Sequence, residues 1–279
     1  MAITGATERP TSRSHVITSA DGRRSRVRNA NQRDRLLMIG SPLLLLVLWE
    51  LGTRSGVLDQ RFFPAPTAIF AQMLSMIESG ELWEHTGASL QRFFLGFWVG
   101  VVPALVIGIL MGLNRGVRAA LTPIVSGTYP IPKSALLPLI LLIFGLGEMS
   151  KVVMVAIGVF YPVVLNTMSG VLQIQPIHYD VAKNFQASRW RVFRTIALPG
   201  AMPSIMTGIE LGAGLGLILI ALAEMVGAES GLGFMIWNAW ELFKVESMYV
   251  GIMVIAVIGF VVAMLIREFS RILMPWSNR

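Results

Sequence analysis

The sequence predicts an all-α membrane protein with about six transmembrane helices, and two observations support this prediction. Hydrophobic residues make up 54% of the 279 residues and charged residues only 14%, which lies outside the range of ordinary soluble domains. Apolar runs long enough to cross a bilayer also recur along the chain. A run of this kind spans the membrane as a helix, because a helix satisfies its own backbone hydrogen bonds.

The composition also excludes several classes of function. Cysteine is absent, so disulfides, thiol catalysis and cysteine metal sites cannot occur. The three histidines are scattered at positions 15, 85 and 178 and do not form the cluster that a membrane enzyme needs. We therefore predict no catalytic residue and no metal ligand. A formal net charge of +7 would suit nucleic acid, but the charges follow the two sides of a membrane instead.

Residues 1–35 are predicted to be a disordered, basic, cytoplasmic tail, because they are rich in Ser, Thr, Asn and Arg and poor in apolar residues. The first transmembrane helix is predicted at 36–52. A basic run before an apolar run is also typical of a secretory signal, but no small-residue cleavage pattern follows. We therefore interpret the basic run as the cytoplasmic anchor of the first helix.

Residues 53–90 are predicted to be an extracytoplasmic link, and 91–270 to form the core of the protein. Gln91 and Arg92 are expected to precede the second helix of the bundle. Residues 271–279 are predicted to be a cytoplasmic C-terminus. The five remaining spans are predicted at about 93–113, 120–145, 151–173, 205–227 and 249–267.

The third of the six spans is interrupted by prolines. Prolines at this density kink or break a helix, and broken backbone at membrane depth is tolerated only against protein or a water-filled path. We therefore expect this segment to face the interior of the helix bundle. The interrupting residues are Pro123, Pro130, Pro132 and Pro138.

Six spans place both termini on the same side of the membrane. The segments then expected on that side are 1–35, 114–118, 174–200 and 267–279, and they hold most of the Lys and Arg residues of the chain. Because cytoplasmic loops carry such an excess, we predict that both termini and the long loop at 174–200 are cytoplasmic.

This long loop has a helical pattern of its own. Pro176 suits a first helical turn and Asp180 suits the positive start of a helix, which favours a short helix over about 176–185. Ser188 can then cap a second helix. On that helix Trp190, Phe193 and Ala197 would share one apolar face, and Pro199 is expected to end it. By pattern alone, the loop is equally typical of a simple basic connector held in place by its arginines.

The loop resembles that of binding-protein-dependent ABC importer permeases, in which Glu-Ala-Ala is followed by Gly-Ala and then by Ile-x-Leu-Pro. Asp180 is a shorter acid than the family's Glu, and Gln186 stands where the family has glycine. Gln186 therefore either adopts a costly left-handed backbone conformation, or the turn is built differently. The matching positions are Asp180, Val181, Ala182, Ala187, Ile196, Leu198 and Pro199.

The resemblance extends over about residues 60–270. Within the family, the chain is similar to the nitrate, sulfonate and taurine branch of these permeases. It implies an ABC type I importer permease fold. The implied function is the transmembrane subunit of an ATP-driven importer in the bacterial inner membrane, moving a small solute such as a sulfonate, taurine or nitrate. The further matching segments are 64–67, 79–83, 143–151 and 227–233.

The resemblance also implies partners. The chain has no Gly-x-x-x-x-Gly-Lys-Ser/Thr stretch, so ATP and magnesium are expected on a separate ABC ATPase that docks on 176–199. An extracytoplasmic solute-binding protein and a second copy of the permease are the other expected partners. The residues expected to couple the loop to the ATPase are Asp180, Val181, Ala182, Gln186, Ala187, Arg189, Arg191, Arg194, Leu198 and Pro199.

Polar residues inside the spans are candidates for the translocation path. Glu210 and Glu224 lie nearly four turns apart on roughly one face of the fifth span, and Lys133 in the broken span is able to pair with either acid. The alternatives are that Glu210 and Lys133 extend to the interfacial water, and that Asn166 makes a hydrogen bond between helices.

Two further interpretations stay open. The segment 227–240 is expected to be an irregular plug at the outer mouth, where it meets a binding protein or supplies an interfacial aromatic belt. The chain as a whole is also compatible with an ion-gradient-driven secondary transporter. Such a transporter uses no ATPase and often shows repeated halves, and no convincing repeat is visible.

Overall fold

The structure is a computed structural model of the chain, and it describes residues 37–38 and 40–277. The predicted tail at 1–35 lies outside the described residues. The chain divides into two compact units, and the boundary between them in the sequence falls between Thr67 and Ala68.

The first unit contains a helix over 40–54 that carries many exposed apolar side chains, as expected for part of the span predicted at 36–52. The chain then turns back on this helix. The Glu50 carboxylate accepts hydrogen bonds from the backbone N–H and the hydroxyl of Thr67, at 3.1 and 2.9 Å. The Thr53 hydroxyl donates to the carbonyl of Phe63 at 3.2 Å. These bonds hold the residues after the helix against its last turns.

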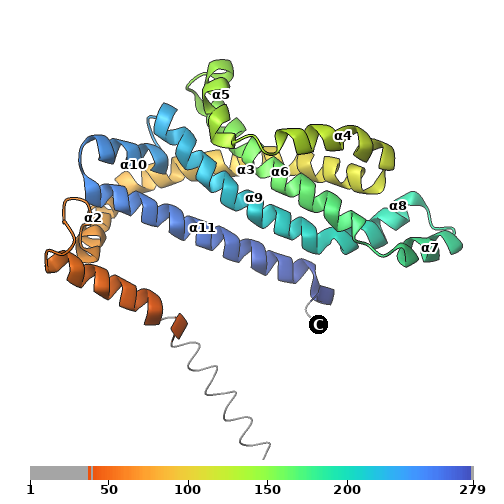
Figure 1. Ribbon diagram of the computed structural model, residues 1–279, viewed down its shortest axis with the longest axis horizontal. Helices are drawn as coiled ribbons and strands as arrows, with labels where there is room; N and C mark the ends of the chain where they lie inside the picture. The colour runs from red at the N-terminus through yellow and green to blue at the C-terminus, as the bar shows by residue number, and fades with distance from the viewer. Residues whose placement is uncertain (1–36, 39, 278–279) are drawn as a thin grey trace, which may run out of the picture. The chain divides into compact units, whose positions relative to one another are not determined.

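The second unit is a bundle of long helices (Figure 1). Among the described residues, four helices are long and apolar enough to cross a membrane. They overlap the segments predicted as the second, fourth, fifth and sixth spans. These helices are α3 (Glu81–Leu113), α6 (Glu148–Leu172), the continuous helix Arg189–Gly227 that ends in α9 (Leu198–Gly227), and α11 (Val245–Leu273).

Helix α6 lies at the centre of the bundle, between α3 and α9. Valines of α6 form the main core together with Phe93 and Val101 of α3 and Ala213 and Ile220 of α9. The contact between α3 and α6 is close because α3 presents glycines to it, as is common for membrane helices. An added Cβ would lie 2.5–2.6 Å from an α6 atom at each of four positions, namely Gly96, Gly100, Gly108 and Gly112.

The proline-rich span is broken, as predicted. Helix α4 (Arg115–Thr128) is followed by a short 3-10 turn, η1 (Lys133–Leu136), and by α5 (Leu137–Phe144), and the two arms are bent by 88°. The expectation that this segment faces the bundle interior is wrong for much of it. Only one side of α5 packs inward, through its buried residues, because the bend turns this short helix away from the bundle axis (Figure 1). The exposed side carries Leu139, Leu142 and Ile143.

Two helices differ from their predicted limits. Helix α2 (Pro66–Glu78) is followed by Gly80 at a φ of 84°, and α3 begins directly after it at Glu81 rather than at Gln91. The segment expected to be an irregular plug instead contains the helix α10 (Leu232–Glu241). The reason for this second difference is the capping of α10 by side chains from other helices, described below.

Candidate functional site

The long loop folds into two short helices, as predicted, with α7 at Pro176–Asn184 and α8 at Arg189–Val192. The Ser188 hydroxyl caps α8 by accepting a hydrogen bond from the N–H of Arg191 at 3.3 Å. Between the helices, Gln186 adopts a φ of 50°. The first of the two alternatives for this residue is therefore the observed one. A left-handed conformation at a non-glycine residue costs about 1–3 kcal/mol, so Gln186 carries strain.

Pro199 does not end the second helix, contrary to the prediction. Between α8 and α9 the chain forms a π-helical turn, η2 (Phe193–Ala197), and the N–H of Leu198 bonds to the carbonyl of Phe193. This wider turn lets the helix continue, with Pro199 in the first turn of α9, where a missing N–H is tolerated. The loop and the fifth span are thus one helix of 39 residues, Arg189–Gly227.

The loop exposes large apolar side chains. Phe185 is 80% exposed and Trp190 is 68% exposed, and the ring of Trp190 lies 5.4 Å from that of Phe193. The predicted face is divided, however, because Ala197 is fully buried. Contiguous exposed apolar side chains of this size are typical of a surface that binds another protein or a membrane.

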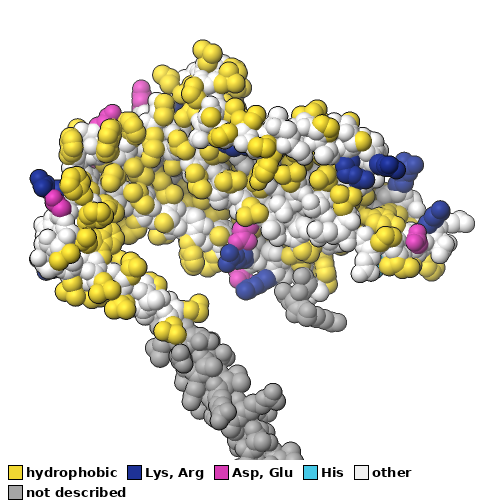
Figure 2. All heavy atoms as spheres, viewed as in Figure 1, with side chains coloured by type: hydrophobic (Ala, Val, Ile, Leu, Met, Phe, Trp, Pro, Cys, Tyr) yellow, Lys and Arg dark blue, Asp and Glu magenta, His cyan; other side chains and the backbone are white. Residues whose placement is uncertain are grey.

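Basic side chains lie at the same end of the bundle as this apolar surface. Figure 2 shows Lys and Arg side chains gathered at the end of the bundle that carries α7 and α8. Asp180 and Arg191 are exposed, and neither forms an ion pair within the described part of the chain. Burial raises the pKa of the Tyr179 phenol above its ordinary value, so this side chain of α7 is neutral at physiological pH. The remaining predicted loop residues, apart from the buried Ala182, lie at or near the surface.

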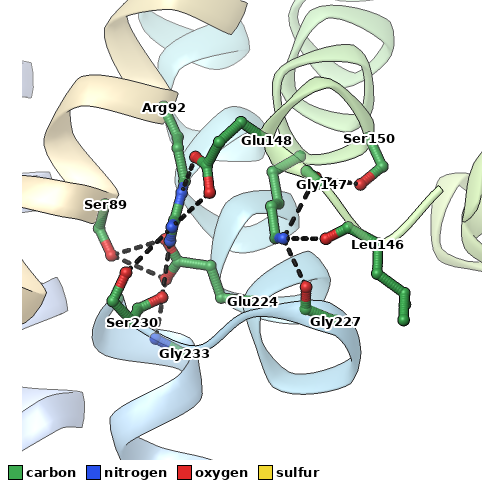
Figure 3. A network of polar contacts seen from close by, with 12 residues as sticks. Ser89, Arg92, Leu146, Gly147, Glu148, Ser150, Glu224, Gly227, Ser230 and Gly233 are labelled. Carbon is green, nitrogen blue, oxygen red and sulfur yellow. Dashed lines mark hydrogen bonds and ion pairs between the residues drawn. The ribbon is translucent and has the colours of Figure 1, made fainter. Parts of the chain in front are cut away.

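A second polar site lies at the α10 end of the bundle and is centred on Arg92 of α3 (Figure 3). Its guanidinium binds both oxygens of Glu148, at 2.5 and 2.8 Å, and one oxygen of Glu224, at 2.9 Å. It also donates to the carbonyl and the hydroxyl of Ser230, at 2.6 and 3.1 Å. A guanidinium has five N–H groups, so every donor of Arg92 is bonded.

Glu224 is completely buried, and its carboxylate is enclosed by donors. Besides Arg92, it accepts hydrogen bonds from the hydroxyl of Ser89 at 2.7 Å and from the N–H of Gly233 at 3.0 Å. Gly231 passes directly over the carboxylate with a φ of 114°, and a Cβ at this position would lie 2.3 Å from the Glu224 Cδ. Only glycine allows this approach of the backbone to the buried charge.

The same side chains cap the N-terminus of α10. The N–H of Gly231 donates to His85 Nδ1 at 3.2 Å, that of Leu232 to the Ser89 hydroxyl at 2.7 Å, and that of Gly233 to Glu224. The start of a helix leaves such groups unsatisfied and favours a nearby negative charge. Helix α10 therefore forms because α3 and α9 supply its caps, which the local sequence does not reveal.

Lys151 of α6 fixes the neighbouring chain turns. Its ammonium donates to the carbonyls of Leu146 and Gly147, at 2.6 and 3.2 Å, and to the carbonyl of Gly227 at the end of α9. The side chain is only 2% exposed. A cation at this position satisfies the free carbonyls of a helix C-terminus, so Lys151 ties α6 to the end of α9.

The polar residues predicted for the translocation path lie in four different environments. Glu224 belongs to the buried site. Glu210 instead pairs with Arg267 of α11 at 2.7 Å, near the surface. Asn166 donates to the carbonyl of Pro162 in its own helix at 2.8 Å, so the bond that the structure shows lies within α6 and not between helices. Pro162 precedes Asn166 by four residues, about one helical turn, so the Asn166 side chain reaches this carbonyl along the surface of its own helix.

Lys133 does not pair with either acid. Its ammonium donates to the carbonyls of Thr128, Tyr129 and Ile131, at 2.9–3.1 Å, and lies 4.0 Å from the centre of the Tyr161 ring. These three carbonyls lie at the break after α4, and the three bonds occupy all three donors of the ammonium. Lys133 therefore stabilises the broken backbone.

The sequence reasoning missed most of the Arg92 site. His85, Ser89 and Arg92 follow one another at spacings of four and three, which places them on one face of α3. That spacing was a usable signal. Within the described residues no group of three or more His, Asp or Glu is arranged to hold a metal ion. The chemistry of the site is that of a satisfied ion-pair network, without a free nucleophile or a vacant donor.

The fold and the two sites define a polytopic membrane protein. One end of its bundle carries an exposed loop suited to a partner, and the other end carries a fully bonded ion-pair network. Residues 104–273 match the family described as binding-protein-dependent transport system inner membrane component. The chain belongs to this family, and it is a membrane-spanning permease component.

Curated relatives agree with this assignment. The chain is 34% identical over 251 residues to the taurine transport system permease protein TauC of Escherichia coli, covering 88% of this chain and 91% of the relative. It is 32% identical over 237 residues to the putative aliphatic sulfonates transport permease protein SsuC of Bacillus subtilis, covering 85% and 86%. The fold is also that of a chain of the MetNI methionine ABC transporter in inward-facing conformations. The TM-score is 0.60 at 18% identity, over 67% of this chain and 93% of the solved chain.

Proposed function

We propose that this chain is the permease subunit of an importer for taurine or another small sulfonate, driven by ATP hydrolysis on a separate ATPase. The observation that supports this proposal most strongly is the exposed loop α7–α8. Its exposed Phe185 and Trp190 offer an apolar ridge, and its arginines offer a charged rim, which suits helix-in-groove docking. Substrate choice then rests mainly with an extracytoplasmic binding protein, and ATP and magnesium are held by the ATPase.

The continuous helix Arg189–Gly227 gives the proposal a mechanism. Because α8 and α9 are joined without a break, a force applied to α8 by a moving ATPase is transmitted directly along the fifth span. Gly227, at its far end, is tied to α6 through Lys151. In this proposal the loop is cytoplasmic, as the excess of Lys and Arg in it favours, and the α10 end faces the binding protein.

We also propose that two copies of the chain line one path. Helices α4 and α5 together have the length and composition of one broken span, and residues 129–132 between them are exposed. Broken backbone in a span has to face protein or water rather than lipid. The outward apolar side of α5 would then pack near a second copy. Of the predicted path residues, Lys133 and Glu210 stay candidates, whereas Asn166 and Glu224 take part in packing in the conformation observed.

Co-purification tests the proposal. The tagged chain, expressed from its native locus, is purified in mild detergent, and ATP hydrolysis is measured on the material obtained. We expect an ATPase subunit to accompany the wild-type chain and to be lost when Asp180→Lys and Arg191→Glu are combined. Lys244→Glu is the matched control, because Lys244 is also exposed but lies at the α10 end. If the chain purifies alone, and an ion gradient drives taurine uptake into vesicles that contain it, the result would instead support a secondary transporter.

A further inference from the structure

The turn that ends α10 has an unusual residue at its central position. The N–H of Phe243 donates to the carbonyl of Trp240 at 3.1 Å, and the N–H of Lys244 donates to the carbonyl of Ala239 at 2.8 Å. Helices that end with this pair of bonds usually have a glycine in the left-handed conformation between them. Phe243 takes the place of that glycine, with a φ of 54°. A bulky side chain is rare and strained in this backbone conformation.

The chain gives Phe243 little packing in return for this strain. Phe243 is 87% exposed, and its neighbours Trp240 and Leu242 are 56% and 54% exposed. We call these three residues the aromatic ridge. Contiguous apolar side chains of this size on a surface are typical of a site that binds another protein or a membrane. Backbone strain at such a site points to a contact outside the chain, because glycine would serve the turn better.

The helix that carries the aromatic ridge is firmly held. Its N-terminus is capped by side chains of α3 and α9, and its inner side is buried through Met235 and Ile236. A Cβ at Gly251 of α11 would lie 2.5 Å from the Ile236 side chain, so these two helices are in close contact. The ridge therefore sits on a rigid element, and a partner that binds it loses little free energy in ordering the surface.

The ridge lies at the end of the bundle opposite the loop α7–α8, and the exposed charges of the second unit at this end are almost all negative (Figure 1). Lys244 is the one exposed base there within the described part of the chain. The first unit adds no net charge, because its described charges pair as Glu50 with Arg54 and Asp59 with Arg61. Six exposed acids at this end of the second unit form no ion pair with described residues, namely Glu78, Glu81, Glu84, Glu229, Glu241 and Glu246.

A protein suits this surface better than a membrane does. Three exposed charged residues, Glu241, Lys244 and Glu246, flank Phe243 in the chain and would have to follow the ridge into the bilayer, which is costly. The excess of negative charge also repels anionic lipid headgroups. A protein that carries Lys and Arg around an apolar depression would instead be attracted, and such attraction raises the rate of encounter.

We propose that the aromatic ridge is the docking site of the extracytoplasmic solute-binding protein, and that this partner meets it with an apolar depression rimmed by Lys and Arg. The inference rests on the proposed function, and it adds the surface used and the chemistry of the partner. Phe243 is the anchor of the contact. Because glycine suits the turn better, loss of the Phe243 side chain should weaken docking without weakening the fold.

Phe243→Gly separates docking from folding. The purified chain with its ATPase is placed in nanodiscs of phosphatidylcholine, and ATP hydrolysis is measured against the concentration of the taurine-loaded binding protein isolated from the same organism. We expect Phe243→Gly to need about tenfold more binding protein for half-maximal stimulation, with a midpoint of thermal unfolding at or above that of the wild type. An unchanged requirement, or an unfolding midpoint below the wild-type value, contradicts the proposal.

Phe260→Ala is the matched control for this measurement. Phe260 is 69% exposed, but it lies in the apolar part of α11 that spans the membrane. Its replacement should shift the concentration of binding protein needed by less than about twofold. An equal loss in the control and in Phe243→Gly would show that the effect does not belong to the ridge.

The acidic surroundings of the ridge give a second test. Glu241→Gln combined with Glu246→Gln removes two charges beside Phe243, and we expect it to raise the concentration of binding protein needed by about threefold at low salt. The difference from wild type should disappear at about 0.5 M salt, because salt screens exposed charges. Glu268→Gln is the control, at the far end of α11. Neutralised variants that bind as tightly as wild type at low salt would contradict a basic partner.

A photoreactive benzophenone analogue of phenylalanine at position 243 distinguishes a protein from a membrane. We expect it to form an adduct with the taurine-binding protein on illumination. An adduct with lipid, and none with this protein, overturns the proposal. If no taurine-binding protein stimulates the wild-type complex, the proposed function fails. If the wild type is stimulated and Phe243→Gly responds equally, only the docking site fails.

Discussion

The two ends of the bundle use charge in opposite ways. At the α10 end, Arg92 and Glu224 are buried and fully bonded within the chain. At the α7–α8 end, Asp180 and Arg191 are exposed, and so is a large aromatic side chain of the same loop, Trp190. The first arrangement holds helices together, and the second offers groups that the chain itself does not satisfy. The role of a charged residue in a membrane protein therefore depends on whether the chain itself supplies its bonding partners.

Loss of one partner in the buried pair is the largest effect that we expect. Arg92→Ala leaves the buried Glu224 carboxylate without its cation, which costs about 3–5 kcal/mol in the free energy of unfolding. Glu224→Ala should cost less than Arg92→Ala, because Arg92 keeps Glu148 as a counter-ion. The measurement is chemical unfolding in detergent. Replacement of both residues, Arg92→Met with Glu224→Leu, is the control and should cost less than either single change. A cost below about 1 kcal/mol for both single variants would show that the pair is not buried as described.

Gly231→Ala sharpens the same comparison, with a smaller effect. The added methyl group would lie 2.3 Å from Glu224 at a φ of 114°, so we expect a loss of about 2 kcal/mol in stability. Gly214→Ala is the control, because its Cβ meets no atom within 4 Å and its backbone is helical. That variant should be neutral or gain about 0.5–1 kcal/mol. Similar losses for both would contradict the close approach at Gly231.

Gln186→Gly should give the smallest effect, at the other end of the bundle. The change relieves the left-handed strain at a φ of 50°, and we expect a gain of about 1 kcal/mol, seen as a higher midpoint of thermal unfolding. Gln186→Val, which tolerates this conformation poorly, is expected to lower the midpoint. If valine and glycine give the same midpoint, the turn does not hold this conformation in solution.

Much of the bundle follows from the sequence, because hydropathy and proline act locally. The second to sixth spans, the break between α4 and α5, and the helix near 176–185 were all predictable from residues within a few turns. The continuation of the helix through Pro199 was not predictable in this way. A π-helical turn at Phe193–Ala197 shifts the hydrogen bonds before the proline, and no local signal marks it.

The Arg92 site was less predictable because its bonds join distant parts of the chain. Arg92 and Glu224 are 132 positions apart, and Ser89 and Leu232 are 143 apart. Glu224 was identified as an interior acid, but a single sequence does not reveal its partner. Helix α10 was missed for the same reason, since its N-terminal groups are satisfied by residues from α3 and α9.

One paired measurement tests the contrast between the two ends most directly. Trp190→Ser and Arg92→Ala are purified in parallel, and both the co-purified ATPase and the free energy of unfolding are measured. We predict that Trp190→Ser, at a side chain 68% exposed, loses the ATPase but keeps wild-type stability. Arg92→Ala should lose stability. The account is contradicted if Trp190→Ser destabilises the chain while the ATPase stays bound.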